Sequence, residues 1–390
     1  MQTLIELYDE RPLENVLGVE VFRPERVVYI CPPKVVRDRA LQRRLRDYFA
    51  HRGQAVELEF VKADVYRAES IVKTLRGVAA RWPDCAVDIT GGTDAVLYAA
   101  GMLGAELPIP AFTYSRRKNR FYEIHNAAFA ADRPCQVVYS VEDCFRMAGG
   151  QMRQGRVDNS VLARYEADIP PFFRVFLQYR REWVRLVSYI QRISGTEGEN
   201  PPLAVRGAYR VKGERGSTLE APEEGLQALA RIGFLRELEI DPASGVAFRF
   251  RDQQLRTWLR DVGSVLELWV YKACRDSGLF DDVRLSAVVD WEQSGKNAAV
   301  SNELDVMCTR GVTPVFISCK TGEVKTEALN ELAILRDRFG GGIARAAIVT
   351  AERGGTPMRN RAAELNIRVI DLEDLSQTRL ARQIRKLMKD

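Results

Sequence analysis

Two neighbouring segments near the C-terminal end of the sequence carry side chains that could do chemistry together. Glu303 and Asp305 stand in the first segment, and Ser318 and Lys320 stand in the second, after a turn at Gly311. Residues two apart lie on the same face of a β-strand, so both pairs can meet at one edge of a sheet if the segments form a hairpin. Carboxylates and a lysine gathered there could hold a divalent cation and a water molecule against a phosphodiester. The pattern therefore favours a metal-dependent nuclease.

Length and composition limit the other possibilities. A chain of 390 residues, 46% hydrophobic and 28% charged, has an ordinary globular composition and is long enough for more than one domain. The net charge of +5, from 58 basic and 53 acidic residues, neither requires nor excludes a polyanionic partner. No run approaches the length of a membrane span, and the first residues lack the apolar stretch of a signal peptide. We therefore expect a cytoplasmic protein without a membrane partner.

The cysteines and histidines argue against several classes of enzyme. The seven cysteines are scattered, odd in number and never in a Cys-x-x-Cys pair, which disfavours disulfides and structural zinc and favours a reducing compartment. Only two histidines, His51 and His125, are present. A histidine-based nuclease, a zinc hydrolase with several histidine ligands and a serine hydrolase triad are therefore not expected.

Residues 1–145 alternate strand and helix patterns. Short strand-like runs are separated by amphipathic, helix-like stretches, in the order 27–30, 35–49, 56–61, 68–82 and 86–89. Single helices between strands are typical of a parallel, doubly wound sheet. Ligands bind at the carboxyl ends of the strands in such sheets, and the first of these runs ends beside Pro32.

The segment Thr90-Gly91-Gly92-Thr93 follows one of these strands and precedes a helix. The two glycines let a ligand approach the backbone, where amide groups and the positive end of the helix favour a phosphate or another anion. A simple helix cap, with Thr90 or Thr93 as the capping residue, accounts for the same pattern. The segment lacks the features of a P-loop and of a full dinucleotide fingerprint.

A hairpin with a basic tip is predicted at 112–124. The tip reads Arg116-Arg117-Lys118-Asn119. It is either solvated or, if it leans over the glycine turn, placed to contact phosphates, with Arg116 as the candidate.

Residues 146–255 have another character. A long amphipathic helix is predicted from Pro170 to Ile193, and a helix at 223–232 followed by a hairpin at 233–250 resembles a winged helix. The candidate recognition helix, EEGLQALARIG, is poor in side chains that read bases. A connecting or dimerising module is therefore favoured over one that reads a nucleic-acid sequence.

Residues 256–390 hold the motif described first. The predicted order is helix, three strands, helix and strand, at 263–271, 285–291, 302–307, 315–320, 327–338 and 346–350. Glu267 is the only acid in the first helix, and a turn is predicted at 295–297. This order fits a restriction-endonuclease-like α/β core.

This last part resembles the PD-(D/E)XK nuclease superfamily. In that superfamily a helix glutamate, an aspartate on the second strand and an acid-x-lysine on the third strand form the metal site. The matching residues are Glu267, Asp305, and Ser318 with Lys320. The resemblance further leads us to expect that Glu267, Asp305 and the backbone carbonyl of Cys319 hold the cation.

Ser318 departs from the acid of that superfamily. A hydroxyl group is a weaker ligand for a hard cation than a carboxylate. Either Glu303 supplies the missing charge or Ser318 positions a water molecule.

The first part resembles a CARF domain, the sensor of CRISPR-associated effectors, through its strand at 27–33 and its turn at 90–93. With both resemblances on one chain, the sequence is similar to the CARF-domain PD-(D/E)XK effector nucleases of type III CRISPR systems. That family implies a homodimer that binds a cyclic oligoadenylate, the tetra-adenylate, across two CARF domains and then cleaves nucleic acid with Mg²⁺ or Mn²⁺ in antiviral defence. The expected ligand-binding residues are Pro32, Thr90, Gly91, Gly92, Thr93 and Arg116.

Two other functions stay open. The chain could be a constitutive restriction-like DNA endonuclease whose winged-helix region reads DNA, or a nucleotide-binding regulator with a degenerate nuclease fold. Neither a base-reading helix nor an aromatic stacking platform is evident, so little sequence preference is expected. The sequence does not distinguish nicking of duplex DNA, cleavage of single-stranded DNA and cleavage of single-stranded RNA.

Overall fold

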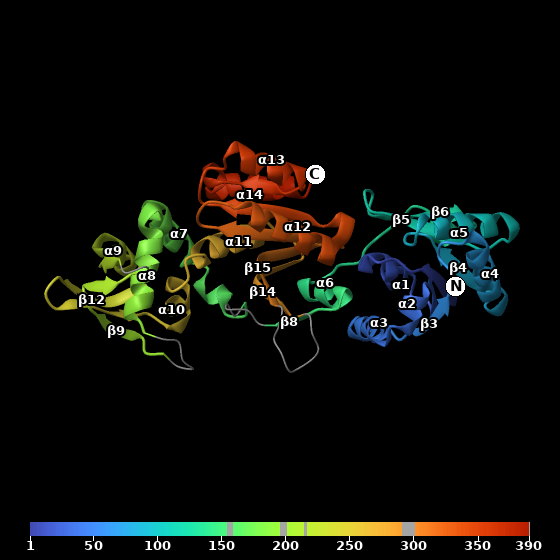
Figure 1. The fold of residues 1–390 in the computed structure, drawn as a ribbon, viewed down its shortest axis with the longest axis horizontal. Coiled ribbons are helices and arrows are strands. Elements are labelled where there is room, and N and C mark those ends of the chain that lie inside the picture. The colour runs from blue at the N-terminus through green and yellow to red at the C-terminus, as the bar shows by residue number, and fades with distance from the viewer. Residues whose placement is uncertain (154–158, 196–200, 214–216, 291–300, 390) are drawn as a thin grey trace.

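The computed structural model describes residues 1–153, 159–195, 201–213, 217–290 and 301–389, so the turn predicted at 295–297 lies outside the described residues. Three parts lie in a row along the long axis of the molecule (Figure 1). The C-terminal part is in the middle, the N-terminal part lies on one side, and a connecting part lies on the other. Within the described ranges, none of the helices combines the length and apolarity needed to span a bilayer.

The N-terminal part is built on a seven-stranded sheet of order β3-β2-β1-β4-β5-β6-β7. The first five strands in this order run parallel to one another. Strand β6 is antiparallel to β5, and β7 is antiparallel to β6. The five parallel strands confirm the predicted parallel α/β architecture. The strands are β1 (Thr3–Leu7), β2 (Arg26–Cys31), β3 (Glu57–Lys62), β4 (Cys85–Asp88), β5 (Ala111–Ser115), β6 (Arg120–His125) and β7 (Arg133–Pro134). The helices are α1 (Leu17–Phe22), α2 (Pro33–Arg37), α3 (Arg39–His51), α4 (Ala68–Arg81), α5 (Asp94–Glu106) and α6 (Val141–Ala148).

Two features of this part differ from the sequence prediction. The central strand β1 is not among the predicted strands, although all of its residues are buried, because Glu6 interrupts its apolar run. The helix expected at 35–49 is two helices, α2 and α3. Asp38 has extended backbone between them, and its side chain caps α3 by accepting a hydrogen bond from the Leu41 amide.

The connecting part packs four α-helices around a small sheet of order β12-β13-β9. Its elements are α7 (Ile169–Gln178), α8 (Trp183–Ile193), β9 (Ala204–Gly207), β10 (Arg210–Lys212), β11 (Thr218–Glu220), α9 (Glu223–Arg231), β12 (Leu235–Asp241), β13 (Gly245–Phe250) and α10 (Gln253–Leu259). Helix α9 and the β12–β13 hairpin fall where they are expected, and their assignment as a winged helix stays a prediction.

The single helix predicted from 170 to 193 is wrong. A short 3₁₀ turn over 180–182 separates α7 from α8. None of the residues of that turn is buried, so no packing holds a continuous helix there. Trp183, which follows the turn, is fixed by its indole N–H, which donates to the carbonyl of Val262.

The C-terminal part is built on a six-stranded sheet of order β18-β17-β16-β15-β14-β8. Strands β14 (Asp282–Asp290), β15 (Ser301–Arg310) and β16 (Thr313–Lys320) are antiparallel, and β17 (Arg345–Thr350) and β18 (Arg368–Ile370) run parallel to β16. Helices α11 (Ser264–Asp276) and α14 (Gln377–Leu387) share one hydrophobic core with one face of the sheet. Helices α12 (Thr326–Gly340) and α13 (Thr356–Glu364) share another core with the other face.

The parts are joined by shared packing rather than by loose linkers. Strand β8 (Gln151–Arg153) lies in the segment expected to be a connector, yet it pairs with the edge strand β14 of the C-terminal sheet. Phe145 of α6 packs on Phe339 of α12, with ring centres 5.1 Å apart. The domain limits 1–145, 146–255 and 256–390 stay a prediction, and α6 with β8 places the N-terminal part against the α12 side of the C-terminal sheet.

Candidate active site and ligand-binding edge

Asp305 and Lys320 meet on the side of the C-terminal sheet that α12 covers. Nζ of Lys320 lies 3.6 Å from Oδ2 of Asp305. The same oxygen accepts hydrogen bonds from the Ser318 hydroxyl at 3.1 Å and from the Cys319 amide at 2.6 Å. The Asp305 side chain is 16% exposed and that of Lys320 is 40% exposed, so the pair can be reached from solvent. The structure therefore brings these predicted catalytic residues together.

The β15–β16 ladder positions these groups. Its paired residues run from Arg310 opposite Thr313 to Val306 opposite Ile317. Beyond that pair the Asp305 side chain, rather than the backbone of β15, accepts the Cys319 amide. In antiparallel strands the N–H and C=O of one residue point toward the same neighbour, so the Cys319 carbonyl also faces β15.

A small cavity of about 80 Å³ opens beside the ion pair. Glu303, Asp305, Ser318 and Lys320 line it from the sheet, and α12 lines it with a stripe at helical spacing, Ala328, Glu331, Leu332 and Leu335. Leu332 and Leu335 are buried and Glu331 is exposed. The volume is enough for about two or three water molecules, so a cation with part of its hydration shell would fit.

Ser286, which the spacing of the sequence motif does not indicate, holds the side chain of Glu303. The hydroxyl of Ser286 donates a hydrogen bond to the Glu303 carboxylate, and the β14–β15 register places Ser286 opposite Asp305. Ser286 is buried, and its φ of 53° lies in the left-handed region that non-glycine residues seldom adopt. Strained backbone of this kind clusters at functional sites, and here it adjoins the candidate catalytic cavity.

Glu267 lies across the sheet from this cavity. Helix α11 packs on the opposite face, and Glu267 is 6% exposed within that core. Burial raises the pKa of the Cys319 thiol well above its usual value, and the carboxylates of Asp305 and Glu267 raise this pKa further. Both acids are thus near Cys319, but Glu267 does not line the cavity. Its role as a cation ligand stays a prediction.

The cavity offers the right kind of donors for a hard cation. In the part of the chain that the structure describes, no three Asp, Glu, His or Cys side chains already form a metal cluster. Three carboxylates, Glu303, Asp305 and Glu331, nevertheless line one small cavity, and Mg²⁺ and Mn²⁺ prefer oxygen ligands. The sequence prediction omits Glu331, although this acid stands in an otherwise apolar stripe of α12.

The glycine turn at the carboxyl edge of the N-terminal sheet is packed against the chain itself. Gly92 has a φ of 97°, which favours glycine, and its amide donates to the Asp9 carboxylate at 3.0 Å. A Cβ at Gly91 would lie 3.0 Å from the carbonyl oxygen of Leu7. The Asp9 carboxylate therefore already accepts a hydrogen bond from the Gly92 amide, one of the backbone amides that were expected to bind an anionic ligand.

The two threonines of the turn make bonds of different kinds. The Thr90 hydroxyl accepts a hydrogen bond from the Tyr114 amide at 2.9 Å. Thr93 precedes α5 at the N-cap position, but its side chain makes no capping bond and its hydroxyl instead donates to the Val65 carbonyl at 3.3 Å. The simple cap by the Thr93 side chain, one of the two interpretations of this segment, is therefore wrong.

Two buried acids lie beneath the same turn. Asp88 is 1% exposed and accepts a hydrogen bond from the Thr90 amide, and burial raises the pKa of Asp88 to about 7. Burial, and then the neighbouring Asp88, raise the pKa of Glu6 well above its usual value. A side chain at Gly18 would collide with the carboxylates of both. Both acids beneath the turn therefore hold a proton at a higher pH than they would in water.

Pro32 and Arg116 lie at the same carboxyl edge. Pro32 follows β2 and precedes α2, and Arg116 follows β5. The Arg116 guanidinium pairs with buried Glu14, which also pairs with Arg11 at 3.6 Å. A Cβ at Gly342 would lie 2.9 Å from Nη1 of Arg116. Arg116 therefore reaches the C-terminal part instead of only leaning over the glycine turn.

These contacts form a continuous chain between the two sheets. Gly92 bonds to Asp9, Asp9 accepts a hydrogen bond from Nε of Arg11 at 2.9 Å, and Arg11 and Arg116 share Glu14. This series of contacts ends at Gly341 and Gly342, the glycines that follow α12. Because α12 lines the candidate catalytic cavity and Gly342, which follows α12, lies against Arg116, one continuous segment lies near both candidate sites.

Comparisons with known proteins identify one domain and the overall fold. Residues 255–388 match the family model of the Card1-like endonuclease domain. The whole chain has the fold of protein VC1899 from Vibrio cholerae, with a TM-score of 0.75, 17% identity, and coverage of 99% of this chain and 98% of that one. It also has the fold of Can2 from Sulfobacillus thermosulfidooxidans in complex with cyclic tetra-adenylate, with a TM-score of 0.74, 17% identity and coverage of 99% of both chains. No curated protein matches the sequence.

The endonuclease match agrees with the nuclease that the sequence predicts for the C-terminal part, and the assignment of the N-terminal part as a CARF domain stays a prediction. The C-terminal part carries a Card1-like endonuclease domain. At 17% identity, the likeness to Can2 and VC1899 establishes the fold that surrounds this domain.

Proposed function

We propose that this protein is a metal-dependent endonuclease of type III CRISPR antiviral defence that cyclic tetra-adenylate switches on. The observation that carries the proposal is the contact between Asp305 and Lys320 inside a Card1-like endonuclease domain. The fold likeness to Can2 in its complex with cyclic tetra-adenylate supports the choice of activator. The seven cysteines are all free, which is consistent with a reducing cytoplasm.

Asp305 and Lys320 act at the scissile phosphate. The Lys320 ammonium group orients the attacking water or stabilises the negative charge that develops on the phosphoryl oxygens. Asp305 binds the cation, and the Cys319 amide and the Ser318 hydroxyl orient its carboxylate. A Mg²⁺ or Mn²⁺ ion, when bound, would lower the pKa of a water molecule and neutralise negative charge on the phosphate. The Cys319 carbonyl is a further candidate ligand of the cation, and Glu267 stays a candidate although α11 packs on the other face of the sheet.

Glu303 and Glu331 supply the negative charge that Ser318 lacks. Lys320 neutralises Asp305 in part, so a divalent cation needs more carboxylate oxygen than Asp305 alone provides. Glu303 lines the cavity from β15, with Ser286 fixing its carboxylate, and Glu331 lines the cavity from α12. A cation site that includes Glu331 also ties cation binding to the position of α12.

Activation is a linkage between the two sheets. The ligand must bind the cutting-competent state better than the resting state, because equal affinity for both states shifts nothing. A cyclic ligand with repeated phosphates suits a two-fold site formed by Thr90, Gly91, Gly92, Thr93 and Pro32 of two chains in a homodimer. A phosphate that competes with Asp9 for the Gly92 amide would disturb the contact chain that ends beside α12.

The substrate is a nucleic acid that is cut with little sequence preference. Single-stranded DNA, duplex DNA that the enzyme nicks, and single-stranded RNA all present the phosphodiester that the site requires. Helix α9 presents Glu223, Glu224 and Gln227 with a single arginine in its last turn, a poor set for reading bases in the major groove.

A cleavage assay with Mn²⁺, with and without cyclic tetra-adenylate, tests the proposal. We expect cutting only when the ligand is present. Cutting that does not depend on the ligand would indicate a constitutive restriction-like endonuclease. Ligand binding without cutting of any of the three substrates would indicate a regulator with a degenerate nuclease fold.

A further inference from the structure

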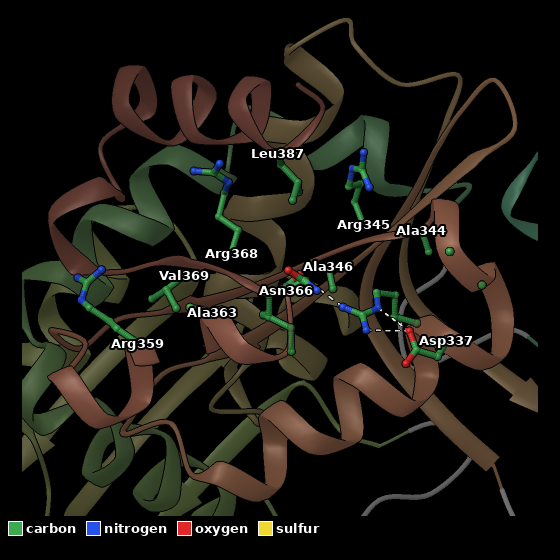
Figure 2. A pocket seen from close by; sticks show the side chains of 14 residues that line it. Asp337, Ala344, Arg345, Ala346, Arg359, Ala363, Asn366, Arg368, Val369 and Leu387 are labelled. Atoms are coloured by element: carbon green, nitrogen blue, oxygen red, sulfur yellow. Dashed lines mark hydrogen bonds and ion pairs between the residues drawn. The ribbon is translucent and has the colours of Figure 1, made fainter. Parts of the chain in front are cut away.

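Figure 2 shows a cavity that is lined by arginines. It lies at the other end of the C-terminal sheet from Lys320, because Arg345 begins β17 whereas Lys320 pairs with Thr350 at the end of that strand. It has a volume of about 600 Å³, and its arginines are Arg336, Arg345, Arg359 and Arg368. Among the described residues that line it, the only acid is Asp337. Guanidinium groups from α12, β17, α13 and β18 therefore gather on one concave surface.

Two of these arginines are used by the fold. Nη1 of Arg336 donates to the carbonyl of Leu365 at 2.6 Å, and the same guanidinium pairs with Asp337 at 2.7 Å. Arg359 pairs with buried Asp371 at 2.5 Å. These bonds tie α12 and α13 to the segments around β18, and they already engage both carboxylates.

Arg345 and Arg368 lie at the edge of the sheet. They are the first residues of the adjacent parallel strands β17 and β18. In Figure 2 both side chains extend to the same side of the sheet edge, one on either side of Leu387. Guanidinium groups presented together at a concave surface suit phosphate oxygens, which arginine binds through paired N–H donors.

Helix α14 extends the positive charge beyond the cavity. Its sequence, QTRLARQIRKL, holds four basic residues and no acid, and its buried residues are Leu380, Ile384 and Leu387. Leu387 also lines the cavity, so the basic helix adjoins the cavity wall. A small anion would need the cavity alone, whereas a basic surface that continues along a helix fits a polyanion.

We propose that this cavity binds the phosphate backbone of the nucleic-acid substrate, away from the cut. This inference rests on the proposed nuclease function. The register pairs Val315 with Arg345 and Lys320 with Thr350, so the cavity and the catalytic lysine are separated by roughly 17 Å along the strands. A single strand spans that distance with a few nucleotides. The cavity therefore holds the strand and contributes affinity without touching the scissile phosphate.

The test is the double variant Arg345→Ala/Arg368→Ala in the full chain. Binding of a fluorescent single-stranded oligonucleotide is followed by anisotropy over a range of salt, in EDTA so that no cut occurs. We expect an affinity loss of about tenfold or more and a salt slope that is smaller by about 1.4, because each phosphate contact with a single strand contributes about 0.7. In cleavage, KM rises and kcat stays unchanged.

The matched control is Arg236→Ala/Arg249→Ala. These two exposed arginines pair across β12 and β13 in the connecting part, and we expect wild-type binding. Unchanged affinity and slope in the Arg345/Arg368 variant, or an equal loss in the control, overturns the proposal. Weaker binding of inorganic phosphate by the Arg345/Arg368 variant, with oligonucleotide binding retained, would overturn the proposal and assign a small-anion site instead. Failure of the nuclease proposal can be told apart from failure of this one, because strand binding is measured without cutting. If the nuclease proposal fails, the protein binds the strand but does not cleave it under any condition.

Discussion

The catalytic cavity and the ligand-binding edge are assembled in opposite ways. In the cavity, Asp305, Ser318 and Lys320 come from neighbouring strands, and one β-ladder brings them together. At the edge, the Gly92 amide meets Asp9, which is 83 residues away in the sequence. The first arrangement is local and stiff, whereas the second depends on contacts that another anion could replace. The proposed chemistry therefore depends on local strand geometry, and the proposed control depends on exchangeable contacts between distant segments.

The largest effect is expected in the local site. The substitution Asp305→Asn removes the negative charge that binds the cation. The oxygen of the new side-chain amide can still accept the hydrogen bond from the Cys319 backbone amide. We expect cleavage to fall about 10³-fold or more, with an unchanged unfolding temperature and unchanged affinity for cyclic tetra-adenylate by calorimetry. Cleavage near the wild-type rate would remove Asp305 from the chemistry.

The next effect tests whether α12 contributes to the cation site. For Glu331→Gln we expect Mn²⁺ affinity, followed by electron paramagnetic resonance, to fall about tenfold to a hundredfold, because the cavity loses a carboxylate. Glu327→Gln is the matched control, since Glu327 lies one turn earlier on α12 and does not line that cavity. Equal affinities in the two variants would exclude Glu331 and leave Glu303 to complete the site.

A smaller effect is expected at the contact chain between the sheets. Glu14→Gln removes the charge that Arg11 and Arg116 share. We expect cleavage at saturating cyclic tetra-adenylate to fall about tenfold, within the usual range of coupling free energies, although the ligand still binds. Glu10→Gln is the control, because the exposed pair of Glu10 with Lys34 contributes little. Normal activation of the Glu14 variant would show that this chain carries no signal.

The smallest effect concerns stability and pH. Burial raises the pKa of Asp88 from 3.8 to about 7, so the folded state holds a proton that the unfolded state releases, and stability falls as the pH rises through this interval. Asp88→Asn cannot ionise. At pH 8 we expect this variant to unfold roughly 2–4 °C above the wild type, with the difference lost near pH 4. A difference that does not change with pH would contradict the linkage.

The residues of the catalytic hairpin could be predicted because their geometry is local. Alternation along two strands is enough to place Asp305, Ser318 and Lys320 on one side of a sheet. Glu331 comes from a helix that packs over those strands, and Ser286 acts through a backbone conformation, so neither follows from strand spacing. The partners of the glycine turn, Asp9 above all, depend on tertiary contacts that no short motif contains.

The same reasoning explains where the predicted fold succeeds. Strands and helices that alternate along residues 1–145 were enough to predict a parallel sheet, since each parallel crossover needs a helix. Strand β1 escapes prediction because a buried Glu6, whose pKa burial raises, looks like a surface residue in the sequence. The break between α7 and α8 depends on the bond from Trp183 to Val262, a contact with a distant segment.

The division of labour between the two sheets is tested most directly by Lys320→Ala, measured for two properties in one preparation. These are the affinity for cyclic tetra-adenylate and the rate of nucleic-acid cleavage with Mn²⁺ at saturating ligand. We expect wild-type affinity and no cleavage above background. Retained cleavage, or loss of ligand binding together with cleavage, would contradict the account.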